Sequence, residues 1–488
     1  MKVSKMNDGF DLVEYGVDFA EQHGASYVEA RFINRYDENY TLRNGSVIGI
    51  LETESLGVGI RVISDGGVAF GSTDQLTKQN LENTVLRVIK LAKLAQRKDP
   101  IVFSAEKFEE TKWNTPVKQE FQEISKEDKL RFFKTVEKRQ KREAGRALKN
   151  RLLYLDMLKD HKYYMNNEGA KIESTNSVIS LFGYFTAKVR NRTEQRQLGL
   201  GAAKGWEWIT EQNIEDHIIR ESLALVNTTA NAKSYEFQNL VDVVVSGEVA
   251  GIMCHENVGH PSEADRILGR EGAQAGESFY RNLWEGDFQP GKIRIGSDCV
   301  TVVDDSTYSE NAGYYLYDDE GVKARPRKLI KDGMLNDLLM NREFAARFNC
   351  NSSAASRAYA YDREPLTRMA NTYMAPGDFE QEELFQDIQE GLYMKSFTEW
   401  NIDDRRFQSK YVGLECYLIK NGELTSQQIR RPILELTTFG IFQNVDAVGK
   451  GYFAPYGSCG KGDPMQAVSV SMGGAHFRIR NVRVGRGL

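Results

Sequence analysis

The pattern of apolar positions changes its period within the first hundred residues. Apolar side chains recur every three to four residues at 10–24 and again at 77–97, which predicts an amphipathic helix in each segment. Residues 27–73 alternate instead between apolar and polar, and the turn-forming sequences Asn44-Gly45 and Asp65-Gly66-Gly67 interrupt them. This order of helix, antiparallel strands and helix predicts an α+β unit.

The chain from residue 98 to residue 232 carries a weaker pattern. Residues 98–122 have few periodic apolar side chains and are expected to form a loop, whereas residues 125–160 are expected to be helical and heavily charged. Their local excess of Lys and Arg is more typical of a solvated helix face than of a nucleic-acid patch. Strands over 163–212 and a helix over 211–232 complete an N-terminal α/β domain, 1–232, with subregions 1–97 and 125–232.

The second half of the chain consists mainly of alternating segments and glycine-rich loops. An apolar strand at 240–245 leads into a helix, and only one further short helix is expected, at 379–394. Hairpin turns are predicted at Asp332-Gly333 and Asn421-Gly422. We therefore expect a β-rich, barrel-like C-terminal domain, 233–488, in which a large antiparallel sheet or partly closed barrel holds the first helix. The fold class is α+β.

That first helix carries the residues with the clearest chemistry, His255, Glu256 and His260. Two imidazoles can bind zinc, and a glutamate beside the first of them can accept a proton from a water that the metal activates. Five residues along a regular α-helix turn the two histidines ~140° apart, so they could not face one ion. We therefore predict a π-type bulge, kink or break between Met253 and His260, with Gly259 as its most tolerant position.

The composition of the chain argues against several functions other than metal binding. A histidine pair is often only a hydrogen-bonded core pair, but this chain has just 6 histidines and two of them flank this glutamate. A net charge of −5 argues against nucleic-acid binding. No apolar run approaches the ~20 residues that cross a bilayer, and the N-terminus lacks the apolar core of a signal peptide, so a cytoplasmic protein is expected. The 5 cysteines are widely spaced and do not form a disulfide framework.

A catalytic zinc site needs a third protein ligand and leaves one position for water. Cys459 lies between glycines in the sequence GSCGKG, where Lys461 would favour its thiolate. Glu263 and Asp265 could ligate the metal or could hydrogen-bond a ligating imidazole. On the residues alone the third ligand stays open among Glu263, Asp265, Asp318, Asp319, Glu320, His476 and Cys459.

Four segments resemble the TldD/PmbA family of zinc-dependent proteases, in its catalytic TldD branch. The helix sequence CHENVGHPSEAD resembles the family's metal-binding helix, and YDDEGVKARPRKLIKDGML resembles the hairpin that follows it. LTRMANTYMAPGDFEQEELFQDIQEGLYMK resembles the family's Arg-Met-x-Asn-Thr segment, and GSCGKGDPMQAVSVSMGG its C-terminal glycine-rich loop. The four segments occur in the family's order, and the resemblance as a whole extends over most of the chain.

The resemblance implies a set of site residues and partners. It maps the zinc ligands onto His255, His260 and Cys459, and the catalytic glutamate onto Glu256. It implies an N-terminal α/β domain and a C-terminal β-rich domain. It also implies unfolded or short peptide substrates, and either homodimers or heterodimers with a sister family member that lacks the metal-binding sequence.

These expectations combine into metal-assisted hydrolysis of peptide bonds, with Glu256 as general base and then general acid. Two alternatives stay open. One is an exopeptidase similar to dipeptidyl-peptidase III, although no downstream glutamate helix of the kind that such enzymes use is found in the sequence. The other is a non-catalytic scaffold with a structural zinc, which would normally have four protein ligands and no open position.

Overall fold

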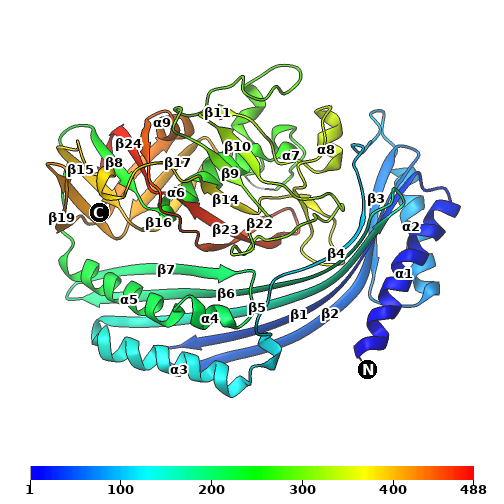
Figure 1. Ribbon diagram of the computed structural model, residues 1–488, viewed down its shortest axis with the longest axis horizontal. Coiled ribbons are helices and arrows are strands. Elements are labelled where there is room, and N and C mark those ends of the chain that lie inside the picture. Colours follow the sequence, from blue (N-terminus) through cyan, green and yellow to red (C-terminus); the bar gives the residue numbers. More distant parts are fainter. Residues whose placement is uncertain (1, 274, 488) are drawn as a thin grey trace.

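The computed structural model describes residues 2–273 and 275–487, with side chains from residue 9 onward. The first 232 residues form one strongly curved sheet with helices at its end and along its outer face (Figure 1). The strands are β1 (Tyr27–Arg43), β2 (Ser46–Ser64), β3 (Gly67–Thr73), β4 (Glu110–Asn114), β5 (Leu148–Asn166), β6 (Lys171–Val189) and β7 (Arg192–Ala202). The helices are α1 (Lys2–Gln22), α2 (Lys78–Leu94), α3 (Lys126–Glu143), α4 (Glu207–Glu211) and α5 (Ile214–Asn231).

The sheet is built from longer strands than the sequence pattern predicts. The order is β3-β2-β1-β5-β6-β4, and β7 pairs with β6 as well. The antiparallel hairpins at Asn44-Gly45 and Asp65-Gly66 are confirmed. Strand β1 extends over 17 residues, because it pairs with β2 on one side, with a register shift between Thr41 and Leu42, and with β5 on the other side from Glu29 to Arg43. β4 lies in the predicted loop 98–122 and pairs in parallel with β6.

The predicted helix over residues 125–160 is wrong in its second part. Helix α3 ends at Glu143 and strand β5 begins at Leu148. Leu153, Leu155 and Met157 point into a core shared with α3 and α5, whereas the residues between them face the opposite side of the sheet. That opposite side carries polar and charged side chains. The segment is therefore as rich in charge as a solvated helix, and this composition hides the alternation of apolar and polar residues that is typical of a strand.

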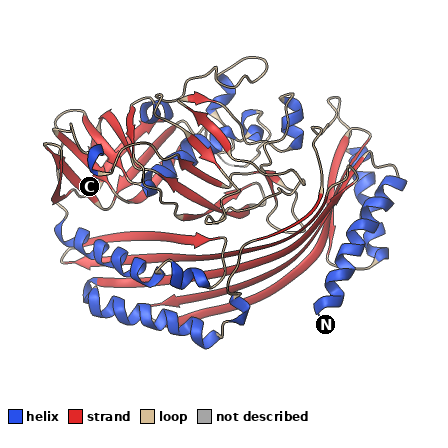
Figure 2. Cartoon of the chain, in the orientation of Figure 1, coloured by secondary structure: helices blue, strands red, loops and turns tan. Residues whose placement is uncertain are grey.

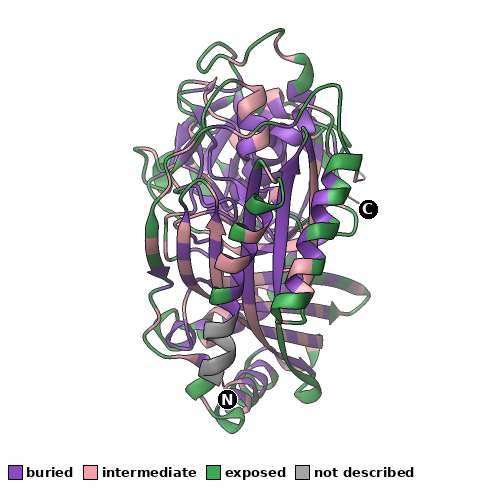
Figure 3. Cartoon of the chain, turned by 90° about the vertical axis from the view of Figure 1, so that its right-hand side faces the viewer, coloured by how far each residue is buried: buried purple, intermediate pink, exposed green. Residues whose placement is uncertain are grey.

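The two faces of strands β5 and β6 therefore serve different purposes. One face packs against α3 and α5 in a hydrophobic core, and the other turns toward the C-terminal half and lines cavities between the two halves. In Figure 3 buried residues fill the interior of the C-terminal half and the inner sides of the surface helices. The concave face of the N-terminal sheet thus carries the polar side chains and faces the C-terminal half.

The C-terminal half is β-rich and lies over the concave face of the sheet, as Figure 2 shows. Its longer strands are β8 (Val241–Val245), β9 (Val302–Asp304), β10 (Arg327–Lys331), β14 (Asn371–Met374), β15 (Glu390–Met394), β16 (Phe397–Ile402), β17 (Gln408–Gly413), β18 (Cys416–Lys420), β19 (Glu423–Gln428), β20 (Pro432–Thr437), β21 (Val445–Val448), β22 (Tyr456–Lys461), β23 (Gln466–Gly474), β24 (Phe477–Val482) and β25 (Val484–Arg486). The two-residue strands are β11 (Met334–Leu335), β12 (Ser356–Arg357) and β13 (Leu366–Thr367). The helices are α6 (Gly247–Cys254), α7 (Ala264–Ile267), α8 (Arg342–Arg347) and α9 (Thr438–Phe442).

These strands form three main sheets instead of one antiparallel sheet. Their orders are β11-β10-β9-β14-β23-β22, β19-β18-β15-β8-β24-β21 and β16-β17-β20-β25. The pairs β14–β23 and β8–β15 are parallel, which turn spacing in a sequence cannot reveal because parallel strands are joined by long connections. The predicted hairpins at Asp332-Gly333 and Asn421-Gly422 are confirmed.

The expected helix over residues 379–394 is wrong. The segment contains a single 3₁₀ turn, Glu382–Leu384, and then strand β15. Strand β15 is held between β8 and β18, and its backbone groups are used by both neighbours. The tertiary pairing overrides a local composition that favours a helix.

Among the residues that the structure describes, no helix combines the length and the apolar character needed to cross a membrane.

Candidate metal centre

The histidine-bearing helix changes its winding at the histidines. Strand β8 leads into α6, which begins after Ser246, whose hydroxyl accepts a hydrogen bond from the N–H of Val249. At His255 the α-helix becomes a π-helical turn, His255–Gly259, and the N–H of His260 donates to the carbonyl of His255 five residues earlier. The predicted π-type bulge is therefore confirmed. The extra residue in the turn brings the two imidazole rings to a centroid distance of 4.8 Å.

The reason for glycine at position 259 differs from the expected one. Its φ and ψ are −59° and −60°, which are ordinary right-handed helical values that any residue adopts. A Cβ at this position would instead overlap the sulfur of Met369, which is fully buried. Gly259 thus allows the π turn to pack closely against its neighbour, and no unusual backbone conformation is involved.

Cys459 reaches the histidines through sheet packing. Strand β22 carries Cys459 and pairs with β23, and α6 lies directly on β23, since a Cβ at Gly251 would meet the backbone of Gly473. The Sγ of Cys459 lies 3.7 Å from Nε2 of His260. One side-chain ligand atom from each of His255, His260 and Cys459 falls within 4.8 Å of the others, and all three residues are buried.

A buried charge network fixes the second imidazole. The Nδ1 of His260 lies 2.9 Å from Oε2 of Glu263, which directs Nε2 toward Cys459. Glu263 also accepts from Nε of Arg266 at 2.5 Å and lies 3.4 Å from Nζ of Lys461. Burial alone would raise the pKa of Glu263, but the charges of Lys461 and Arg266 hold it well below its usual range. Asp265 contacts Lys461 at 2.6 Å and makes no contact with an imidazole in the described structure.

The donor set fits a zinc ion. Burial lowers the pKa of His255, which favours the neutral imidazole, and its buried Nδ1 has no hydrogen-bond partner in the described part of the chain. Burial would raise the pKa of Cys459, but the neighbouring His260 and Arg368 lower it to about 7. Two imidazoles and one thiolate are ligands that zinc commonly takes, and three protein ligands leave one position for water.

Glu256 borders the same site from its open side. Its Oε2 accepts a hydrogen bond from Nη1 of Arg406 at 2.5 Å. Burial would raise the pKa of Glu256, but the charges of His260 and Arg406 lower it, so the carboxylate form is favoured. A cavity of about 490 Å³ opens beside these residues; its lining includes His255, His260, Cys459, Phe182, Tyr184, Phe397 and Trp400.

Four of the other candidates for a third ligand, Asp318, Asp319, Glu320 and His476, lie away from the two histidines. Asp319 pairs with Lys162 of β5 at 2.5 Å, and Glu320 pairs with Arg61 of β2 at 2.6 Å. Asp318 accepts hydrogen bonds from backbone N–H groups in and beside its own loop. The Nε2 of His476 lies 3.1 Å from the hydroxyl of Tyr393. Asp319 and Glu320 thus connect the C-terminal half to the N-terminal sheet.

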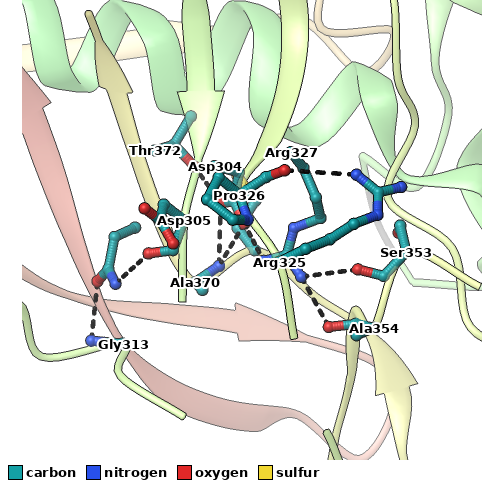
Figure 4. Close-up of polar contacts among 12 residues, drawn as sticks. Asp304, Asp305, Gly313, Arg325, Pro326, Arg327, Ser353, Ala354, Ala370 and Thr372 are labelled. Atoms are coloured by element: carbon teal, nitrogen blue, oxygen red, sulfur yellow. Dashed lines mark hydrogen bonds and ion pairs between the residues drawn. The ribbon is translucent and has the colours of Figure 1, made fainter. Parts of the chain in front are cut away.

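A second buried ion pair supports the sheet that carries Cys459 at its edge (Figure 4). Asp304 of β9 accepts from Arg327 of β10, and it also accepts from the hydroxyl of Thr372 of β14 at 2.7 Å. Arg327 donates in addition to the backbone carbonyls of Ser353 and Ala354. Both charged side chains are fully buried, so the pair depends on these extra hydrogen bonds. Three strands behind the metal centre are thereby held in register.

The sequence matches known protein families over both halves. Residues 238–486, half of the chain, match the family described as the PmbA/TldA metallopeptidase C-terminal domain, and residues 28–92 match its domain 1. A metalloprotease of Methanocaldococcus jannaschii is 28% identical over 485 residues, which cover 98% of each chain. A zinc metalloprotease TldD homolog of Saccharolobus solfataricus is 26% identical over 477 residues, 96% of this chain and 98% of that protein.

A solved structure supports the fold at lower sequence similarity. The crystal structure of TldE from Thermococcus kodakarensis superposes with a TM-score of 0.77 at 14% identity and covers 97% of this chain and 100% of its own. The likeness therefore extends over the curved N-terminal sheet and the β-rich half alike. Together with the family matches, it places the chain in the TldD/PmbA family of metallopeptidases.

Proposed function

We propose that this protein is a zinc-dependent peptidase that hydrolyses unfolded or short peptides. The observation that carries the proposal is the convergence of His255, His260 and Cys459 beside Glu256 at the wall of one cavity. The family membership supports a peptidase, and the name of the Saccharolobus relative supports zinc as its metal.

The chain's own residues have distinct tasks in this reaction. His255, His260 and Cys459 hold the zinc ion, and Glu263 keeps the His260 ring in place. When bound, zinc supplies Lewis acidity that activates water and polarises a carbonyl group. Glu256 accepts the proton of the attacking water and later passes it to the nitrogen of the leaving amine. The protonation state expected of Glu256 is the carboxylate, which this role requires.

The cavities beside the centre suit an extended chain better than a folded domain. The cavity at the metal centre adjoins a second one of about 260 Å³, and Tyr456 and Ser458 line both of them. Both lie between the concave face of the N-terminal sheet and the C-terminal half. The predicted location in the cytoplasm, and the predicted assembly as a homodimer or as a heterodimer with a sister family member, stay predictions from the sequence.

The first test is the zinc content per chain of the wild type and of Cys459→Ala, measured by elemental analysis after dialysis. We expect about one zinc in the wild type and a clear loss in the variant, because the thiolate is one of only three ligands. Cys254→Ala is the matched control, since Cys254 is also buried and adjoins His255 but does not belong to the donor group. It should keep its zinc.

Digestion of denatured casein by the same preparations tests the activity. The wild type should cleave casein, and a chelator should stop the cleavage. Zinc without cleavage would favour the structural-zinc scaffold, although that alternative leaves the open cavity at the centre without a purpose. Products that are uniformly dipeptides would favour an exopeptidase similar to dipeptidyl-peptidase III. A wild type with neither zinc nor cleavage would contradict the proposal.

A further inference from the structure

Arg406 occupies the turn between β16 and β17 in a conformation that favours glycine. Its φ is +63°, in the left-handed region, which is unfavourable for a residue with a side chain and favours glycine. The turn is fixed by the side chain of Asp403, which accepts hydrogen bonds from the N–H groups of Phe407 and Gln408 at 2.7 and 2.8 Å. A strained residue held by its surroundings is a reason to look for a function at that residue.

The guanidinium of Arg406 touches the proposed general base. Its Nη1 donates to Oε2 of Glu256 at 2.5 Å, and the two side chains are 13% and 9% exposed. No hydrogen bond of its Nε or Nη2 to another described residue is found, and Nε is buried. A guanidinium has five N–H donors, so most of them are left for a ligand in the cavity that Arg406 lines.

Hydrogen bonds join the Arg406 turn to the π turn of the metal centre. Asn257, the residue after Glu256, donates to the hydroxyl of Thr438 at 3.1 Å, and that hydroxyl lies 3.4 Å from the carbonyl oxygen of Arg406. The N–H of Thr438 donates to the carbonyl of Phe407 at 2.8 Å. The position of Arg406 is therefore coupled to that of Glu256 through the side chains of Asn257 and Thr438 as well as by the ion pair.

We propose that Arg406 is a second catalytic residue, which orients Glu256 and donates its remaining N–H groups to the oxygen of the scissile carbonyl. This inference rests on the proposed peptidase function. As the water oxygen bonds to the carbonyl carbon, one proton of the water moves to Glu256. The π electrons of the carbonyl group move to the carbonyl oxygen, and Arg406 stabilises the negative charge that forms there. The C–N bond then breaks with its electron pair going to nitrogen, which takes the proton from Glu256, and a carboxyl group and an amine are released.

An arginine at this place fits the charge that develops during the reaction. The peptide carbonyl is neutral before the attack and negative after it, so a fixed cation stabilises the transition state more than the bound substrate. In the free protein the same cation holds the carboxylate of Glu256 in place through the 2.5 Å hydrogen bond from Nη1. Arg406 therefore orients the general base and also stabilises the negative charge that forms on the carbonyl oxygen.

The test compares Arg406→Ala with Arg405→Ala in the full-length, zinc-loaded protein. Arg405 lies in the same turn, but its side chain is 65% exposed and forms an ion pair with one described residue, the exposed Glu277, at 3.5 Å. With an internally quenched peptide that the wild type cleaves, Arg406→Ala should lower kcat about 10²- to 10³-fold and change KM little. Arg405→Ala should leave both constants near the wild-type values. Both variants should keep their zinc.

A binding measurement separates this role from a purely structural one. A phosphinic peptide, in which a tetrahedral phosphinate replaces the cleaved amide, should bind about 100-fold more weakly to Arg406→Ala than to the wild type. The uncleaved parent peptide, measured in chains that also carry Glu256→Gln, should bind equally well with and without Arg406. Arg406→Lys, which keeps the charge but loses the planar fork, should recover part of the lost affinity and show that the site still folds.

Several outcomes would overturn the inference. An unchanged kcat in Arg406→Ala would remove Arg406 from the reaction, and a loss confined to KM, with equal losses for the phosphinic and the parent peptide, would make it a substrate anchor. Either result in a wild type that binds zinc and cleaves peptide leaves the proposed function standing. A wild type without zinc and without cleavage would overturn the proposed function and this inference together.

Discussion

Glu256 and Glu263 lie seven residues apart in one segment, and each accepts a hydrogen bond of 2.5 Å from an arginine. Their surroundings differ in every other respect. Glu263 is fully buried and is also in contact with His260 and Lys461, so its charge is compensated on several sides. Glu256 has a single arginine partner, from a distant turn, and borders the cavity.

In the proposed peptidase, this difference separates the carboxylate that orients a metal ligand from the carboxylate that acts as the base. A carboxylate surrounded by cations and by an imidazole cannot move or change its protonation easily, which suits a residue that orients a ligand. A carboxylate that borders an open cavity can reach a substrate and exchange a proton. Two residues of the same type are thus specialised by their neighbours and not by their own chemistry.

Glu256→Gln should give the largest effect. We expect casein cleavage to fall about 10³-fold, because the amide cannot take the proton of the attacking water. Zinc content should stay near the wild-type value, since glutamine has almost the same shape, whereas the midpoint of thermal unfolding should fall because Arg406 loses its charged partner. Steady-state kinetics, elemental analysis and calorimetry on one preparation make the comparison. Loss of zinc in this variant would contradict the separation of roles.

Glu263→Gln should affect the metal first and activity only through it. We expect zinc affinity to fall 10- to 100-fold, because the carboxylate that orients His260 loses its charge. A competition titration against a chromophoric chelator measures the affinity, and excess zinc should restore most of the cleavage. Asp265→Asn is the control, because Asp265 holds the same Lys461 but has no imidazole contact. If activity stays lost at saturating zinc, Glu263 also takes part in the reaction, which would contradict the separate roles of Glu256 and Glu263.

Gly259→Ala should give the smallest effect, on stability. The new methyl group would overlap the buried Met369, so we expect unfolding to become easier by about 1–3 kcal/mol. Urea unfolding of the metal-free chain measures the change. Gly451→Ala serves as the control, since a Cβ there meets no described atom within 4 Å. Adding Met369→Ala should recover part of the loss, and independent effects of the two changes would argue against a direct overlap.

Local pattern was sufficient for much of the fold. The helices α1 and α2, the hairpin turns with Asn-Gly or Asp-Gly, and the strand before the histidine helix all follow from periodicity over a few residues. Segments whose neighbours are distant in sequence were not predictable in this way. Strand β15 and the first part of β5 carry helix-like compositions, and only pairing with other strands makes them extended.

The candidate site likewise combines features that the sequence predicts with contacts that only the tertiary structure creates. The spacing of His255 and His260 excludes a regular α-helix that directs both rings at one ion and predicts a π-type bulge, a kink or a break, and the structure contains the π turn. The partners of these residues depend on the tertiary structure. Lys461 neutralises Glu263 through the packing of β22, and Arg406 reaches Glu256 from a turn 150 positions along the chain. No signal in the sequence distinguishes Arg406 from the exposed Arg405 beside it.

The sequence by itself determined the chemistry that this protein has at its disposal: two histidines, a glutamate between them, and the unusual turn that their spacing demands. The tertiary structure decided which of the seven candidate side chains forms a compact donor group with both histidines, because the distance between Cys459 and His260 is set by the packing of α6 on β23 and by the pairing of β23 with β22. Local propensities act over a few residues, whereas such distances arise only after the whole core has assembled.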